Sequence, residues 1–239
     1  MDGDTLIDKE VVFSGYNTVQ TAGDIFQLII TRNNIKETDP LHIAATGYGR
    51  KLVTFAGKII TEITCHAKGA CFLDNNIRTV VDIGGQDSKV IALDDQGNVK
   101  DFIMNDKCAA GTGRFLEVMA RALEVDLETF AEISLKSHNP VSISSICTVF
   151  AESEVISGIA RGNKREDIAA GIHLSVASRV HSMANRVMIQ PEIMMTGGVA
   201  KNKAVVGALE KLFVKTIKVD ELAQYTGAIG AAILARSNQ

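Results

Sequence analysis

The residues best suited to chemistry stand where an apolar run near position 80 gives way to two glycines. Asp82 lies inside that run, and Gly84 and Gly85 follow it almost at once. Glycine lets backbone N–H groups approach an anion closely, and a carboxylate beside it can hold Mg²⁺ directly or through water. The same turn offers further polar side chains: Asp87, Ser88 and Lys89. The pattern is typical of a phosphate and Mg²⁺ site, although a hairpin with a polar Gly-Gly turn has the same signature.

Two further glycine turns favour the first of these interpretations. Gly197 and Gly198 again follow an apolar run and open an expected helix, an arrangement that binds anions at the helix N-terminus. The sequence Gly111-Thr112-Gly113 precedes another expected helix. The chain contains no Gly-x-x-x-x-Gly-Lys-[Ser/Thr] motif, and the turn at position 111 lacks the third glycine of a dinucleotide fingerprint. The glycine turns therefore indicate a nucleotide, but give little support to a P-loop or a Rossmann site.

Cys108 and Cys147 form a second chemical lead. Each precedes an expected helix, whose N-terminus favours a thiolate, and Lys107 adds a positive charge beside the first of them. A thiolate could ligate a metal, act as a nucleophile or sense redox state, whereas a lone cysteine more often only packs. No Cys-x-x-Cys motif, no cysteine and histidine at the spacing of metal ligands and no Ser-His-Asp arrangement is visible, so zinc and triad hydrolase chemistry have little support. Cys65 and Cys71 are expected to be core or surface thiols.

Composition limits the kind of protein that carries these residues. The chain has 239 residues, 46% hydrophobic and 22% charged, which is enough for one large domain or for two lobes with cores of their own. Its net charge of -3 offers no excess of positive charge for nucleic acid or an anionic membrane. No apolar run is long enough to span a bilayer, and the acidic start lacks the positive region of a secretory signal. We therefore expect a cytoplasmic protein without nucleic-acid or membrane partners, whose cysteines are not in disulfides.

The elements that must position these residues alternate between strand and helix. Residues 79–83, 88–93 and 99–104 predict an antiparallel meander, because polar turns separate three short apolar runs. Helical periodicity follows, and Asp126 is expected to cap a helix. Strand and helix then alternate, which indicates an α/β protein with a ligand cleft at the strand ends. The other expected strands are 41–46, 141–145, 192–196 and 215–219, and the expected helices are 18–33, 52–70, 112–123, 149–160, 165–188, 201–213 and 225–236.

Several short stretches of sequence together resemble one known family. They are ATGYGR (45–50), EITCHA (62–67), VDIGGQDSK (81–89), NDKCAAGTGRF (105–115), CTVFAESE (147–154) and TGGV (196–199). From Thr46 to the C-terminus the chain resembles the activator component of 2-hydroxyacyl-CoA dehydratases. That activator belongs to the ATPase family that also includes the ATP-binding subunits of benzoyl-CoA reductase.

The resemblance implies a fold of the acetokinase, sugar kinase, heat-shock-70 and actin type, with residues 1–80 and 81–239 as its two lobes. It also implies ATP or ADP with Mg²⁺, and a homodimer that shares one [4Fe-4S] cluster held by Cys108 and Cys147 of each subunit. In the family, ATP hydrolysis is coupled to the delivery of one electron from ferredoxin or flavodoxin to the dehydratase component. Because such a cluster takes four thiolates, two per chain would require a dimer.

The resemblance also assigns roles to single residues. Asp82 and Gln86 would be catalytic, near the phosphates and Mg²⁺. The nucleotide would be held by residues from all the glycine turns: Gly84, Gly85, Asp87, Lys89, Gly111, Thr112, Gly113, Gly197, Gly198 and Val199.

One departure from the family concerns the start of the chain. Family members begin with a strand and hairpin that carry Asp-x-Gly-Ser, whereas this chain begins at the strand that follows, so we expect the fold to lack its first strand and first phosphate loop. Either the start codon is misassigned or this is a truncated copy with impaired ATPase activity. The hypotheses are an ATP-dependent activator, an ATP-binding subunit of a benzoyl-CoA reductase-type complex, and a cluster-binding paralogue that no longer hydrolyses ATP.

Overall fold

The computed structural model describes residues 1–36, 38–143 and 147–236. The chain divides into two units. The first consists of Met1–Asn75 together with the stretch that begins at Tyr225, and the second consists of Asn76–Gln224. The second unit contains every residue that the sequence analysis proposes for the site.

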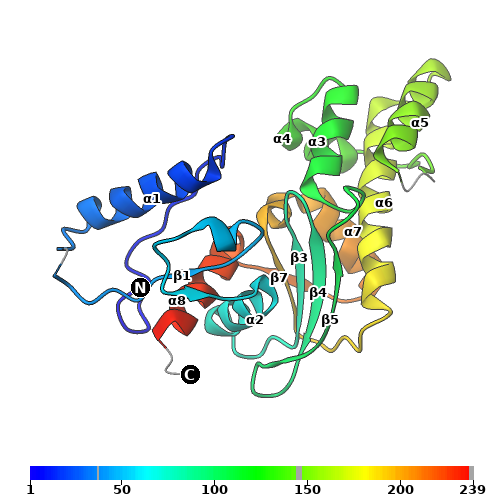
Figure 1. The fold of residues 1–239 in the computed structure, drawn as a ribbon. Helices are drawn as coiled ribbons and strands as arrows, with labels where there is room; N and C mark the ends of the chain where they lie inside the picture. Colours follow the sequence, from blue (N-terminus) through cyan, green and yellow to red (C-terminus); the bar gives the residue numbers. More distant parts are fainter. Residues whose placement is uncertain (37, 144–146, 237–239) are drawn as a thin grey trace. The chain divides into compact units, whose positions relative to one another are not determined.

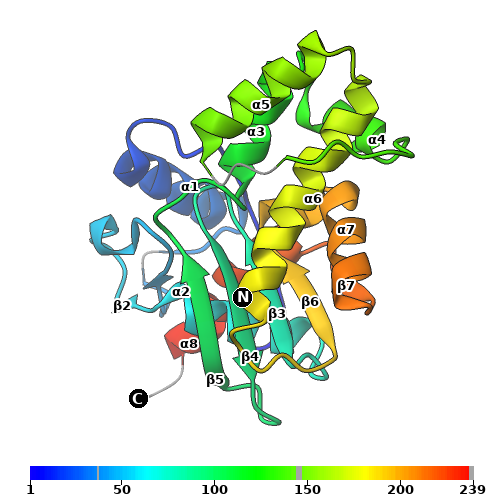
Figure 2. The same cartoon turned by 90° about the vertical axis from the view of Figure 1, so that its right-hand side faces the viewer.

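A five-stranded sheet forms the base of the second unit. Its strands are β3 (Thr79–Ile83), β4 (Ser88–Leu93), β5 (Val99–Asn105), β6 (Ile193–Thr196) and β7 (Ile217–Val219). The strand order is β5-β4-β3-β6-β7, in which β3, β4 and β5 pair antiparallel and β3, β6 and β7 pair in parallel (Figure 2). The predicted antiparallel meander is confirmed. Every residue of β3 and β4 is buried, which fits their largely apolar sequences.

The helices of this unit gather on the sheet and beyond its end. They are α3 (Gly113–Ala122), α4 (Leu127–Ser134), α5 (Thr148–Ala160), α6 (Arg165–Ala184) and α7 (Lys203–Phe213). α6 packs along α7 and touches β4, whereas α3, α4 and α5 lie beyond the strand ends (Figure 1). The predicted helix cap is confirmed, since the Thr129 N–H donates to Asp126 Oδ1 over 2.7 Å. Among the described residues, no helix is both long enough and apolar enough to cross a membrane.

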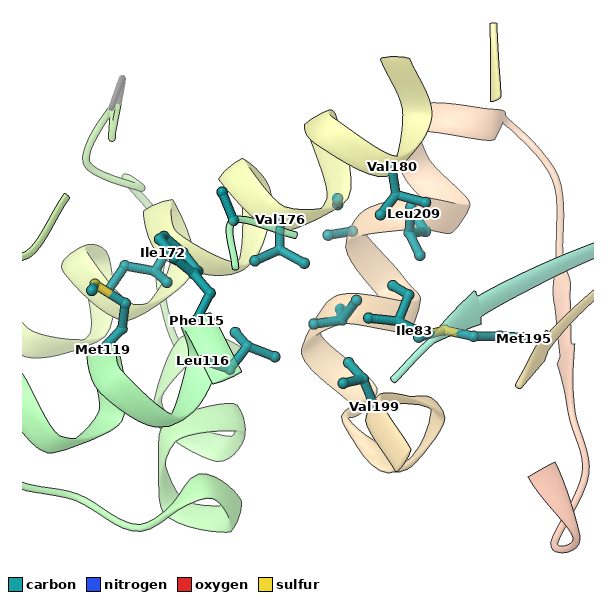
Figure 3. Close-up of a cluster of buried hydrophobic side chains, with 14 of the residues drawn as sticks. Ile83, Phe115, Leu116, Met119, Ile172, Val176, Val180, Met195, Val199 and Leu209 are labelled. Carbon is teal, nitrogen blue, oxygen red and sulfur yellow. The ribbon is translucent and has the colours of Figure 1, made fainter. Parts of the chain in front are cut away.

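The core of the second unit lies where these helices meet the ends of β3 and β6 (Figure 3). Ile83 and Met195 come from the strands, Phe115 from α3, Ile172 from α6 and Leu209 from α7, and each is at most 1% exposed. Fully burying one such side chain stabilises a fold by about 1.5–3 kcal/mol. The packing therefore holds α3 and α6 against the strand ends that carry the candidate residues.

The first unit is built around two helices that cross at close range. Its elements are α1 (Thr18–Arg32), β1 (Ala44–Ala45), β2 (Lys58–Ile59), α2 (Glu62–Leu73) and α8 (Thr226–Arg236). α2 and α8 can pack this closely because Gly69 and Gly230 have no Cβ. A Cβ on Gly69 would overlap the Thr226 carbonyl, and one on Gly230 would overlap the Cys65 carbonyl. Cys65 is buried and Cys71 partly buried, as predicted, and burial raises the pKa of the Cys65 thiol.

The helix predicted over residues 52–70 is shorter at its start than expected. It begins at Glu62, because the Thr61 hydroxyl accepts a hydrogen bond from the Thr64 N–H and so caps the helix. The residues before the cap include β2, which pairs in parallel with β1. The apolar pattern runs on across the cap, which is why periodicity alone misplaces the boundary.

The strand predicted over residues 141–145 is wrong for its described part, residues 141–143. The Val141 N–H donates to the Asp167 carbonyl of α6 rather than to a neighbouring strand. Residues 144 and 145 lie outside the described part of the chain.

His173 is a buried histidine that connects three helices of the second unit. Its Nδ1 donates to the Ala169 carbonyl over 2.8 Å, so its Nε2 carries the lone pair that accepts from the Asn202 amide at 3.1 Å. The ring also packs on Phe130 of α4, with 4.4 Å between the ring centroids. Burial disfavours the charged ring and lowers the pKa of His173 from 6.5 to about 4, against an opposing effect of the Ala169 hydrogen bond. The fold therefore holds the neutral ring.

We expect His173 to make the fold less stable in acid. Because its pKa is about 4 in the folded chain and 6.5 when unfolded, its contribution is complete above pH 6.5 and is lost as the pH falls towards 4. The full difference corresponds to about 3 kcal/mol. Denaturant unfolding of the wild type and of His173→Gln between pH 4 and pH 6.5 measures this contribution to stability. The difference in free energy of unfolding between the two proteins should shrink as the pH falls, and a constant difference would contradict the assignment.

Candidate functional site

The candidate residues meet at one edge of the five-stranded sheet. β3, β5 and β6 end at this edge, and the antiparallel β4 begins there. The segments that follow β3, β5 and β6 carry the predicted glycine turns. The carboxyl edge of such a sheet is where α/β folds place their ligands.

Asp82 is the buried centre of this edge. It is 2% exposed and lies on β3, in register with Lys89 on β4 and Thr196 on β6. Lys89 Nζ donates to Asp82 Oδ2 over 3.0 Å, and Thr196 Oγ1 donates to Asp82 Oδ1 over 2.9 Å. The carboxylate is therefore held from both neighbouring strands.

Lys89 also contacts the turn after β3. Its Nζ donates to Asp87 Oδ1 over 2.7 Å, and its side chain is 3% exposed. Burial opposes the charge on Lys89, but the charge of Asp82 and the hydrogen bond that Lys89 donates to Asp87 outweigh burial and raise the pKa of the ammonium. In this structure Lys89 donates to two carboxylates, and its predicted contact with the nucleotide stays a prediction. The Ser88 hydroxyl is buried, with its oxygen 3.9 Å from the Met183 sulfur.

Backbone hydrogen bonds join the turn after β3 to the N-terminus of α3. The N–H groups of Gly113 and Arg114 donate to the carbonyls of Gly84 and Gly85 over 2.8 and 2.9 Å. A Cβ on Gly113 would stand 3.2 Å from the Gly84 oxygen and 3.3 Å from the Gly85 Cα. The Gly84 N–H donates within its own turn, to the Asp87 carbonyl over 3.0 Å. The start of α3 is thus fixed on this turn at a distance that only a glycine at 113 permits without movement.

Gly197 brings the turn after β6 onto the same strand end. Its φ is +84°, and a Cβ there would overlap the Ile83 carbonyl and stand 2.8 Å from Asp82 Oδ1. The Gly197 N–H donates to the Ala223 carbonyl over 3.0 Å. The structure therefore brings this turn, the turn after β3 and Gly113 together around Asp82.

Gly85 and Gly198 differ from the tightly packed Gly113 and Gly197, because the packing of the protein does not require a glycine at position 85 or 198. A Cβ on Gly85 would have no heavy atom within 4 Å, and one on Gly198 would have only Gln224 Nε2, at 3.9 Å. Neither residue has a positive φ. Both glycines border open space, where a ligand could approach the backbone closely.

Three other predicted residues occupy different places at this edge. Gln86 is exposed on the turn after β3. Val199 is buried and would touch a Cβ on Gly113 at 3.2 Å. Thr112 is also buried, and its hydroxyl donates to the Ala109 carbonyl over 2.6 Å. Thr112 and Val199 therefore shape the turns, whereas the role predicted for Gln86 stays a prediction.

Gly111 lines a separate cavity of about 670 Å³ together with Phe115, Leu174 and Arg179. Its φ is +86°, and a Cβ there would stand 3.3 Å from Arg179 Cδ. Within its turn it is Gly113, and not Gly111, that meets the other glycine turns.

Cys108 and Cys147 lie on segments that lead into helices of the same unit. Cys108 is partly buried after β5, where the Asn105 amide donates to the carbonyls of Cys108 and Ala110 over 2.8 and 3.0 Å and so folds the loop. Cys147 is exposed and is the N-cap residue of α5, and its side chain makes no capping hydrogen bond. The predicted place before a helix is confirmed for Cys147, whereas the turn at Gly111 separates Cys108 from α3.

Thr196 and Asn105 belong to this region, although the sequence analysis does not single them out. Thr196 could be found from register, because it precedes Gly197 at the end of a strand that pairs in parallel with the strand of Asp82. Asn105 gives no such signal, since its two hydrogen bonds depend on the local course of the loop.

Comparisons with known proteins show which family the chain belongs to. The chain is 51% identical to the (R)-2-hydroxyglutaryl-CoA dehydratase activating ATPase of Acidaminococcus fermentans, over 98% of this chain and 90% of that protein. It is 46% identical to the 2-hydroxyisocaproyl-CoA dehydratase activator of Clostridioides difficile, over 98% of this chain and 88% of that protein. It is 32% identical to one of the subunits of benzoyl-CoA reductase from Thauera aromatica, over 89% of this chain and 77% of that protein.

Solved structures of two of these relatives share the fold. The activator of the 2-hydroxyisocaproyl-CoA dehydratase from Clostridium difficile with bound ADPNP matches with a TM-score of 0.90, over 98% of this chain and 87% of that chain. Component A of the Acidaminococcus fermentans enzyme matches with a TM-score of 0.86 and 52% identity, over 93% of this chain and 86% of that chain. The predicted acetokinase, sugar kinase, heat-shock-70 and actin type of fold is confirmed. A family model described as the BadF/BadG/BcrA/BcrD ATPase family matches residues 9–235, and the chain belongs to that family.

Proposed function

We propose that this protein is an ATP-dependent activator of a 2-hydroxyacyl-CoA dehydratase. In this proposal it hydrolyses ATP to ADP and phosphate and passes single electrons from ferredoxin or flavodoxin to the dehydratase component. The observation that carries the proposal is the meeting of glycine turns around the buried Asp82 carboxylate, in a chain of an ATPase family. Relatives of 46% and 51% identity that are named as such activators suggest the class of partner.

The open backbone at Gly85 and Gly198 supports a nucleotide at this edge. A phosphate needs N–H groups that it can approach without meeting a side chain. Both glycines meet that need without serving the packing. We assign the phosphates to the turn that carries Gly85 and the adenosine to the side of Gly197 and Gly198. A related activator has been solved with bound ADPNP, which supports nucleotide binding as such.

Mg²⁺ fits the oxygen-rich end of β3. Asp82 and Asp87 offer carboxylates and Thr196 offers a hydroxyl, which are the hard oxygen ligands that Mg²⁺ prefers, directly or through water. When bound, Mg²⁺ neutralises the charge that develops on a transferring phosphoryl group. Asp82 would hold the ion through water and orient the attacking water, and the exposed Gln86 amide would help to position that water.

Cys108 and Cys147 fit a [4Fe-4S] cluster shared by two copies of the chain. Such a cluster takes four thiolates, so two from each copy complete it. Cys147 is exposed at the N-cap of α5, next to the first N–H groups of that helix, and its side chain makes no capping hydrogen bond. Those groups favour negative charge nearby. When bound, the cluster takes up and releases one electron.

The surface beside Cys147 supports a second copy there. Val149 and Phe150, in the first turn of α5, are each 66% exposed, and Ile156 is 58% exposed. Neighbouring large apolar side chains on a surface mark sites of protein association. A homodimer would cover these side chains and bring the remaining thiols to the cluster.

An ATP-binding subunit of a benzoyl-CoA reductase-type complex is the second candidate. Identity to the Thauera aromatica reductase chain is 32%, against 51% to the Acidaminococcus fermentans activator, which favours the activator. Purification of a stable hetero-oligomer would favour the reductase. A cluster-loaded dimer that binds nucleotide without hydrolysing it would favour the third candidate, a cluster-binding protein without ATPase activity.

We expect Gly85→Ala to weaken nucleotide binding without unfolding the protein. The added methyl group meets no protein atom within 4 Å, whereas a phosphate against the backbone would be displaced. The affinity for ADP, measured by isothermal titration calorimetry, should fall about tenfold or more. The free energy of unfolding should stay within about 0.5 kcal/mol of the wild type.

Two matched variants control this experiment. Gly207→Ala in α7 also adds a methyl group that meets no atom, so ADP affinity should stay unchanged and stability should stay equal or rise. Gly197→Ala should instead lower stability, because φ is +84° there and the methyl group would overlap the Ile83 carbonyl. Wild-type ADP affinity in Gly85→Ala would show that no phosphate lies against this turn.

The cluster assignment predicts a division among the cysteines. Cys108→Ser and Cys147→Ser should each abolish the brown chromophore and the bound iron of anaerobically purified protein, because each removes a ligand. Cys71→Ser, on α2, should leave both intact. Iron and absorbance are measured per chain. Loss of iron in the Cys71 variant as well would indicate a different ligand set, and iron retained in all three variants would rule out these ligands.

A further inference from the structure

The space between Asp82 and Asp87 is already filled by a positive charge. Lys89 Nζ lies 3.0 Å from Asp82 Oδ2 and 2.7 Å from Asp87 Oδ1. The side chains of Lys89 and Asp82 are each 3% exposed, and that of Asp87 is 15% exposed. The ammonium therefore bridges the two carboxylates where a cation bound to both would sit.

Strand register holds this arrangement in place. Lys89 stands directly opposite Asp82 in the antiparallel pair of β3 and β4, and the Thr196 hydroxyl holds the other carboxylate oxygen. Turning Asp82 towards a metal would break these hydrogen bonds. Moving Lys89 away would leave a buried charge without its partners, which is costly. Neither side chain can therefore change its partner without loss.

A free divalent ion finds only a weak net attraction at this place. The two carboxylates and the ammonium together carry one net negative charge, because the Lys89 ammonium already neutralises one of the two carboxylates. An ion that bound both carboxylates directly would have to displace Lys89 or lie against it, and like charges this close repel strongly. A nucleotide brings oxygens with their own negative charge, so Mg²⁺ can arrive with it and reach Asp82 through water.

We propose that Lys89 is a tethered cation that excludes free divalent metal from the Asp82–Asp87 pair and so makes metal binding depend on nucleotide. The exclusion of free metal needs only these three side chains, whereas the dependence on nucleotide rests on the proposed function. Lys89 is in this account a positioning residue, which acts on the metal through Asp82 rather than by touching a phosphate.

Binding of Mn²⁺, a probe for Mg²⁺, to the nucleotide-free full chain tests the proposal by electron paramagnetic resonance. Wild-type protein should show no Mn²⁺ site tighter than about 1 mM. Lys89→Met removes the charge at similar length and should gain one site that is at least about tenfold tighter. Lys89→Arg keeps the charge and should gain none. Adding Asp87→Asn to Lys89→Met should remove the new site.

Thermal unfolding supplies a second measurement in case Lys89→Met is weakly folded. A metal that binds only the folded chain stabilises it, so Mn²⁺ should raise the melting temperature of Lys89→Met and leave that of the wild type unchanged. A Lys89→Met protein that neither binds Mn²⁺ nor is stabilised by it overturns the proposal. Tight Mn²⁺ binding by nucleotide-free wild type that Asp87→Asn abolishes also overturns it.

Added ADP separates this inference from the proposed function. With ADP present, wild-type protein should bind Mn²⁺ together with the nucleotide. If ADP brings no Mn²⁺ to the protein while the nucleotide-free results hold, the proposed nucleotide site fails and the exclusion of free metal by Lys89 stands. If the nucleotide-free results fail while ADP still brings Mn²⁺, the nucleotide site stands and the role of Lys89 is refuted.

Discussion

The paired carboxylate of Asp82 is the interaction on which the rest of the site depends. Lys89 donates to one of its oxygens and Thr196 to the other, from the strands on either side. These partners are in register with Asp82 only because β4 pairs antiparallel and β6 pairs in parallel with β3. Removing one partner of a buried ion pair costs on the order of 3–5 kcal/mol. The charge therefore depends on the register of the sheet, and the register is in turn favoured by the charge.

The same strand end offers a physical route between the proposed nucleotide site and the cysteines. The turn that carries Gly84 and Gly85 accepts hydrogen bonds from the first N–H groups of α3. Cys108 lies five residues before α3 begins at Gly113. A phosphate that moved this turn would pull on the start of α3 and on the loop before it. Asn105 bonds the same loop to the end of β5, so the loop that carries Cys108 is connected both to α3 and to the sheet.

The sequence predicted the parts of this arrangement that follow from local pattern. Short apolar runs between polar turns predicted β3, β4 and β5, and Asp126 predicted the start of α4, because capping acts within one turn. The partner of Lys89 could not be read from spacing, since a lysine beside a glycine turn suits a phosphate as well as a carboxylate. The start of α2 was misplaced because Thr61 ends an apolar pattern that periodicity would continue. Side-chain pairing across strands and helix caps inside apolar runs are therefore the features that local sequence pattern does not predict.

Hydrolysis of ATP by Asp82→Asn protein tests the central claim most directly. In the proposed function the Asp82 charge acts on the metal and the attacking water, whereas the backbone of the glycine turns would hold the phosphates. Single-turnover hydrolysis should therefore fall by about a hundredfold or more, while the affinity for ADP changes less than about fivefold. Circular dichroism and iron content show whether the variant is folded and loaded. Hydrolysis at the wild-type rate by folded, cluster-loaded Asp82→Asn protein would contradict the account.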